Sequence, residues 1–124
     1  MGRPYSLRML GENIEKELFD VYYNQWGGRG SYTKLQKWLW EEKGENASRH
    51  TVMNAVTRYL MGSFKDPEVK KAVQRQWVSY GKWLSDEDYY RYVSKRVMNL
   101  VKPTSPRYDK FLEDNPEVPD FRNE

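Results

Sequence analysis

The sequence predicts an all-α protein of about five helices that is followed by a flexible, proline-rich acidic tail. Apolar residues recur three and four positions apart through residues 14–100, which is the spacing of helices with one buried face. Four of the six prolines fall after Lys102, where they prevent a long helix. No two segments alternate apolar and polar residues as paired strands do. We therefore expect a helical body in residues 1–102 and an extended tail in residues 103–124.

The first two predicted helices flank a glycine cluster. The apolar stripe of the first helix consists of Ile14, Leu18, Val21, Tyr22, Gln25 and Trp26. The Gly-Gly-Arg-Gly segment at 27–30 ends this helix or forms a hinge. Ser31 is a suitable N-cap for the second helix because its hydroxyl can accept a first-turn N–H, and Lys43-Gly44 ends that helix. The apolar residues of the second helix are Leu35, Trp38, Leu39 and Trp40.

The third and fourth predicted helices also have recognisable starts. Ser48 is the predicted N-cap of the third helix, and Gly62 ends it. Its buried stripe is Val52, Val56, Tyr59 and Leu60. The fourth helix begins at Asp66-Pro67-Glu68, which supplies a cap, a proline at the first helical position and an acid in the first turn. Its expected buried residues are Val69, Val73, Trp77, Tyr80 and Leu84.

A fifth helix is predicted to begin after Ser85 and to end at Lys102-Pro103. Its expected inward residues are Tyr89, Val93, Val97 and Leu100. The three acids at 86–88 are candidate metal ligands, but their place in a first helical turn favours interaction with the helix dipole.

Charge is distributed unevenly along the chain. The whole sequence carries a net charge of +3, but residues 103–124 contain three basic and six acidic residues, against 18 basic and 12 acidic residues in 1–102. A basic body predicts a polyanionic partner, and an acidic arm can screen that body. The apolar residues through which the arm can still dock are Tyr108, Phe111, Leu112 and Phe121.

Missing residue types narrow the function further. The chain has no cysteine and one histidine, His50, which excludes thiolate metal sites, cysteine nucleophiles and multi-histidine zinc sites. The glycine cluster at 27–30 lacks the Lys-Ser/Thr pair of a phosphate-binding P-loop. No apolar run approaches the roughly 20 residues of a membrane span. We therefore expect a cytoplasmic, non-enzymatic protein with no catalytic residues, no cofactor and no metal.

Residues 31–61 read SYTKLQKWLWEEKGENASRHTVMNAVTRYLM. Two short helices here are joined by a turn that contains Gly44 and Asn46, and the second helix opens with Ser48-Arg49-His50. This arrangement resembles the tri-helical core of helix-turn-helix DNA-binding domains, with the second helix in the place of the recognition helix. The resemblance covers about a quarter of the chain and implies that this helix enters the major groove of duplex DNA.

Residue chemistry supports the same hypothesis. A recognition helix buries one stripe on its own domain and leaves the other for base edges, where Arg pairs with guanine and Asn with adenine. The predicted base-contacting residues are Arg49, His50, Asn54, Thr57 and Arg58, with Met53 beside them. The predicted phosphate contacts are Arg29, Lys34 and Lys37.

The sequence thus favours a sequence-specific double-stranded DNA-binding protein. Transcription regulation, and replication or partition of a plasmid, phage or virus, are the expected uses. The alternatives are a helical module of a replication or primase machine that binds single strands through exposed aromatic residues, and a protein-interaction scaffold. An exposed ring can also close a contact in a homodimer. An ordinary helical hairpin with a solvated polar face explains the same pattern without DNA.

Overall fold

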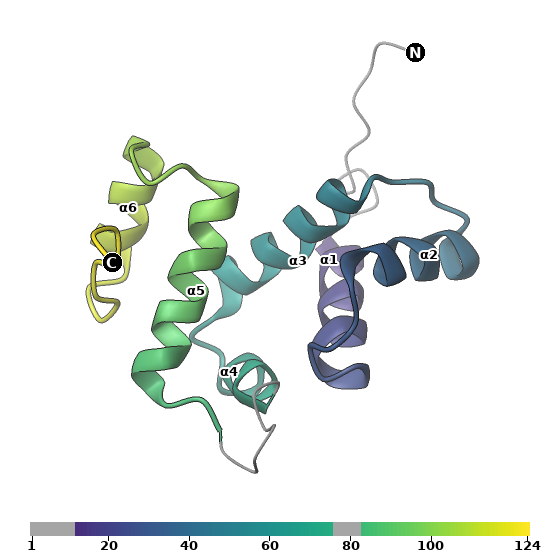
Figure 1. Cartoon of the computed structure of the whole chain (residues 1–124), viewed down its shortest axis with the longest axis horizontal. Coiled ribbons are helices and arrows are strands. Elements are labelled where there is room, and N and C mark those ends of the chain that lie inside the picture. Colours follow the sequence, from purple (N-terminus) through teal and green to yellow (C-terminus); the bar gives the residue numbers. More distant parts are fainter. Residues whose placement is uncertain (1–11, 76–82) are drawn as a thin grey trace. The chain divides into compact units, whose positions relative to one another are not determined.

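The computed structural model describes residues 12–75 and 83–124, and every regular element in these ranges is a helix (Figure 1). This confirms the all-α prediction. The chain divides into two compact units, Met1–Ser63 and Phe64–Glu124, which we call the N-terminal and C-terminal units.

The first predicted helix is formed by two elements, α1 (Glu12–Phe19) and a π-helical turn, η2 (Asp20–Gln25). Three consecutive residues of η2, at 21–23, are buried. A π-turn rotates less per residue than an α-helix, so it keeps neighbouring side chains closer to one face. The glycine cluster ends the element as predicted. Gly30 allows the backbone to lie close to the Trp26 ring. A Cβ on Gly30 would lie 2.5 Å from the Trp26 ring.

The second helix, α2 (Tyr32–Lys43), has the predicted boundaries. Ser31 Oγ accepts the backbone N–H of Lys34 at 3.0 Å, and Gly44 adopts φ 67°, the left-handed conformation that glycine tolerates best. Leu35 and Leu39 are fully buried, whereas Trp40 is 58% exposed.

The third helix, α3 (Arg49–Ser63), packs against both α1 and α2. Its Ser48 cap is confirmed, because Ser48 Oγ accepts the Thr51 N–H at 3.0 Å. The predicted stripe is buried at Val52, Val56 and Leu60, while Tyr59 is half-buried against the Phe19 ring. The buried residues of α3 are Val52, Ala55, Val56, Thr57 and Leu60.

The C-terminal unit begins with α4 (Pro67–Arg75) and α5 (Asp86–Leu100), which pack against each other. The caps Asp66 and Ser85 accept first-turn N–H groups at 2.9 and 3.1 Å, as predicted. The residues confirmed as buried are Val69, Val73, Tyr89, Val93 and Val97, whereas Leu84 and Leu100 are half-buried. The predicted core residues Trp77 and Tyr80 lie outside the described residues.

Residues 103–124 differ from the expected extended arm, and that expectation is corrected. They contain a helix, α6 (Pro106–Asp114), and bury Tyr108, Phe111, Val118 and Phe121. The position of the prolines explains the error. Pro106 occupies the first turn, where its missing N–H costs no intrahelical bond, and Ser105 caps the helix.

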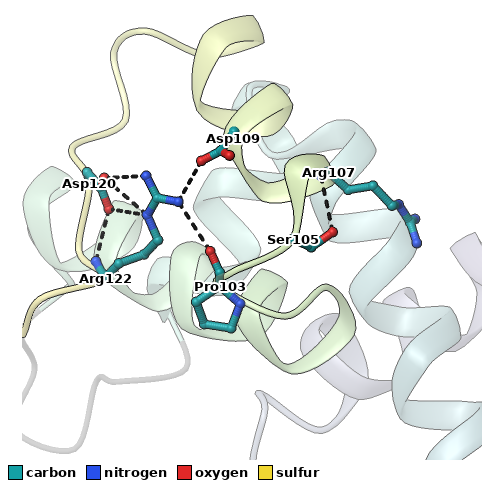
Figure 2. A network of polar contacts seen from close by, with 6 residues as sticks. All are labelled: Pro103, Ser105, Arg107, Asp109, Asp120 and Arg122. Carbon is teal, nitrogen blue, oxygen red and sulfur yellow. Dashed lines mark hydrogen bonds and ion pairs between the residues drawn. The ribbon is translucent and has the colours of Figure 1, made fainter.

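Arg122 fixes the end of the chain onto α6 and onto the loop before it (Figure 2). Its guanidinium donates to Asp120, to Asp109 Oδ1 at 2.6 Å and to the Pro103 carbonyl at 3.2 Å. It also lies 5.2 Å from the centre of the buried Tyr108 ring. Most donors of one side chain are thus used to close residues 103–122 into a loop.

Candidate nucleic-acid interface

The first turn of α3 is the exposed part of the predicted recognition helix. Arg49 and His50 are both exposed, and neither side chain has a hydrogen-bond or ion-pair partner among the described residues. The Ser48 hydroxyl accepts the Thr51 N–H, whereas the backbone N–H groups of Arg49 and His50 have no hydrogen-bond partner among the described residues. Two cationic or polar side chains therefore flank a helix N-terminus that favours anions.

The second half of the predicted base-contacting set is not exposed. Thr57 is only 3% exposed, so its predicted place on the free face is wrong. Because α3 packs against two helices, its consecutive residues 55–57 are all buried. At about 100° per residue these three positions span about 200° of the helix circumference, which leaves a narrow free face.

Arg58 also points into the N-terminal unit. Its Nε donates to Glu15 Oε2 on α1 at 2.7 Å, and the two side chains are only 18% and 16% exposed. The predicted free guanidinium is thus a structural ion pair, which corrects its placement on the free face. No local pattern indicates the partner, since Glu15 lies 43 positions upstream. Asn54 and Met53 are half-buried beside the first turn.

The three predicted phosphate contacts are all exposed, but their environments differ. Arg29 has no side-chain partner among the described residues, and it lies in the connection between η2 and α2. Lys34 lies over the Trp26 ring at 4.4 Å, and Lys37 is 3.8 Å from Glu41 Oε1. These weak surface contacts leave both ammonium groups accessible to a phosphate.

Acidic residues gather around two hollows of the N-terminal unit. Two hollows of about 270 and 310 Å³ lie along α1, η2 and α2, and both are lined by Glu17 and Lys43. Lys43 Nζ forms an ion pair with a Glu17 carboxylate oxygen at 3.1 Å. The other acidic lining residues are Asp20, Glu42 and Glu45. A phosphate backbone would be repelled from these hollows.

The acidic residues of the C-terminal segment are largely neutralised by cations of their own unit. Glu117 pairs with Lys65 at 3.0 Å, and Glu124 pairs with Arg91 at 2.8 Å. By sequence, the N-terminal unit has nine basic and seven acidic residues, and the C-terminal unit has twelve and eleven. Net charge therefore does not distinguish the two units, and the first turn of α3 is one of several places where a described basic side chain has no ion-pair partner.

No known protein family, curated protein or solved structure matches this chain. Within the described ranges, no group of three or more His, Cys, Asp or Glu side chains is arranged to hold a metal ion. None of the described helices is long and apolar enough to span a bilayer.

Proposed function

We propose that the N-terminal unit binds double-stranded DNA and inserts the first turn of α3 into the major groove. One observation carries this proposal. Arg49 and His50 are exposed, have no charged partner in the described part of the chain, and stand at the capped start of a helix that is held by two others. Recognition helices contact base edges mainly through their N-terminal residues.

The roles of the side chains follow from their chemistry. Arg49 can donate two hydrogen bonds to guanine, and half-buried Asn54 can pair with adenine at the margin of the contact. Arg29, Lys34 and Lys37 would neutralise phosphates and position the helix without selecting a sequence. Thr57 and Arg58 are assigned to the fold of the unit and not to DNA.

Transcription regulation in the cytoplasm is the use we favour, ahead of plasmid, phage or virus replication and partition. No enzymatic step is proposed. The five-residue connection 44–48 between α2 and α3, which Gln36 Nε2 clamps by donating to the Ala47 carbonyl at 2.7 Å, supports the helix-turn-helix interpretation.

The test is fluorescence anisotropy with the full chain and duplexes selected from a random library. Affinity should fall steeply with salt, because each neutralised phosphate releases about 0.9 counterion. Arg49→Ala should cost about 1–3 kcal/mol on the selected sequence and much less on random duplex. Lys37→Ala should weaken all duplexes alike.

Lys71→Ala is the matched control, since Lys71 is an exposed cation on α4 of the other unit with no ion pair within the described residues. It removes one positive charge from the C-terminal unit and leaves the N-terminal unit unchanged. A flat salt response, or equal losses for Arg49→Ala and Lys71→Ala, would contradict the proposal.

A further inference from the structure

A second candidate surface lies in the C-terminal unit around Trp83, which precedes α5. Its side chain is 49% exposed, an unusual state for the largest apolar side chain. The neighbouring backbone is held in place by Gln74 at the end of α4. The Leu84 N–H donates to the Gln74 carbonyl at 3.3 Å, and Gln74 Nε2 donates back to the Leu84 carbonyl at 2.9 Å. The exposed ring therefore stands on a fixed support.

A cation lies against this ring. The guanidinium carbon of Arg75 is 5.5 Å from the centre of a Trp83 ring, within the range of a cation–π contact. Arg75 is exposed and makes no ion pair with a described carboxylate. The Trp83 ring thus contacts an accessible positive charge, and about half of the residue remains exposed.

A hollow of about 440 Å³ is lined in part by Leu84, the residue that follows Trp83. It is lined by Leu84, Asp88, Arg91, Tyr92 and Lys95, which come from the start and one face of α5. Tyr92 contributes an aromatic ring that is held by Arg96 at 5.1 Å. Along the chain, an exposed aromatic side chain is thus followed by a hollow that is lined by a second aromatic ring and by two cations.

The carboxylates near the hollow are already paired. Asp86 binds Lys70 at 2.9 Å, and Asp88 and Glu124 both bind Arg91, at 3.0 and 2.8 Å. Lys95 is exposed and has no carboxylate oxygen within ion-pair distance in the described ranges, although its charge still acts on Glu124. Arg91 is shared by Glu87, Asp88 and Glu124, so positive and negative charges balance here. Arg75 and Lys95 are the cations that make no ion pair within the described ranges, and they are the ones that an anionic group can contact.

We propose that this surface binds single-stranded nucleic acid, with an unpaired base stacked on Trp83, the adjoining phosphate near Arg75 and a phosphate further along the strand near Lys95. Alternating cations and exposed aromatic rings suit this ligand because every base has a flat face and every linkage a negative charge. A base stacked in duplex DNA cannot reach the ring in this way. The inference concerns a different unit from the proposed duplex site and does not depend on it.

Trp40 provides a matched comparison within the same chain. It is exposed to a similar degree, at 58%, but lies on α2, and no cation among the described residues lies over its ring, whereas Arg75 lies over Trp83. Trp83→Ala and Trp40→Ala therefore remove the same exposed ring, in one case with a cation against it and in the other without. Both rings are exposed enough that neither substitution should lower the helix content measured by circular dichroism.

The experiment measures binding of the full chain to fluorescein-labelled oligo(dT) by anisotropy, with an abasic oligonucleotide of equal length as the second probe. We expect Trp83→Ala to weaken oligo(dT) binding about tenfold, in line with the loss of one base–aromatic stack. Trp83→Phe should restore most of the affinity. Trp40→Ala should have no effect, and wild type should bind the abasic strand more weakly than oligo(dT).

Three results would overturn the inference. These are equal effects of the two tryptophan substitutions, equal affinity for the abasic strand, and competition by poly-glutamate as effective as by oligo(dT), which would indicate a surface for acidic peptides. Loss of duplex binding in Arg49→Ala with oligo(dT) binding intact would show that the two sites are separate. A chain that binds oligo(dT) but no duplex would refute the proposed function and leave this inference standing.

Discussion

Arg49 in the first turn of α3 and Arg122 near the C-terminus have the same side chain in opposite surroundings. Arg49 is exposed and has no partner among the described residues, whereas Arg122 binds Asp109, Asp120 and the Pro103 carbonyl. The comparison extends to their segments, since residues 103–124 combine ion pairs with buried aromatic rings. A cation with local carboxylates stabilises a fold, and a cation without them is available to a ligand. Net charge along the sequence does not separate the two cases.

The largest effect is expected from the packing of the C-terminal segment. Tyr108→Ala removes a fully buried ring from between α6 and the rest of its unit, so it should lower the free energy of unfolding of the C-terminal unit by about 3–5 kcal/mol. Urea unfolding followed by circular dichroism measures this. Lys110→Ala, at an exposed position of α6, is the control and should be nearly neutral. Equal stability of the two variants would indicate that residues 103–124 form an extended arm and do not pack as a helix.

The next effect tests whether Arg58 stabilises the fold, as Arg122 does, or is available to a ligand, as Arg49 is. Arg58→Ala leaves Glu15 largely buried without its partner, and should lower the stability of the N-terminal unit by about 1–3 kcal/mol. A double-mutant cycle with Glu15→Gln should show coupling between the two positions. Duplex binding by the molecules that remain folded should be unchanged. A loss of base preference with no loss of stability would indicate that Arg58 contacts DNA and does not stabilise the fold.

These corrections show what sequence patterns can and cannot specify. Caps such as Ser31, Asp66 and Ser85 act within one turn, and a local signal was enough to predict them. The Arg58–Glu15 pair depends on the packing of α1 against α3, which no local pattern encodes. The number of prolines does not predict α6, because the effect of a proline depends on its position within a helix.

A smaller effect is expected when the ion pairs of Arg122 are removed directly. Arg122→Ala should lower the unfolding midpoint of the C-terminal unit, by less than Tyr108→Ala, because its carboxylate partners remain solvated. Arg107→Ala is the matched control, since the Arg107 side chain points away from the cluster in Figure 2 and only its backbone N–H binds Ser105. Indistinguishable midpoints for the two variants would mean that the aromatic core alone holds the segment.

The smallest effect is a dependence on pH. Hydrogen bonds from Arg91 lower the pKa of Glu124, and hydrogen bonds from Arg122 lower the pKa of Asp120. Groups whose pKa is lowered by folding stabilise the protein above their unfolded pKa, and this contribution is lost as the pH falls through about 4 and below. Unfolding midpoints measured between pH 6 and pH 3 should therefore fall, and Glu124→Gln should fall less over the same range. A wild-type midpoint that is constant with pH would contradict the assignment.

The π-turn η2 has a consequence for how the chain tolerates changes in length. It holds more residues per turn than the α-helix it extends, so loss of one residue within Asp20–Gln25 can be absorbed by relaxation to α-helical geometry. The face of α1 that packs against α3 would then keep its orientation relative to Trp26. The same deletion inside α3 would rotate every later side chain by about 100° and turn its buried residues toward water. Among homologous chains, single-residue gaps should accordingly gather at η2 and be absent from α3.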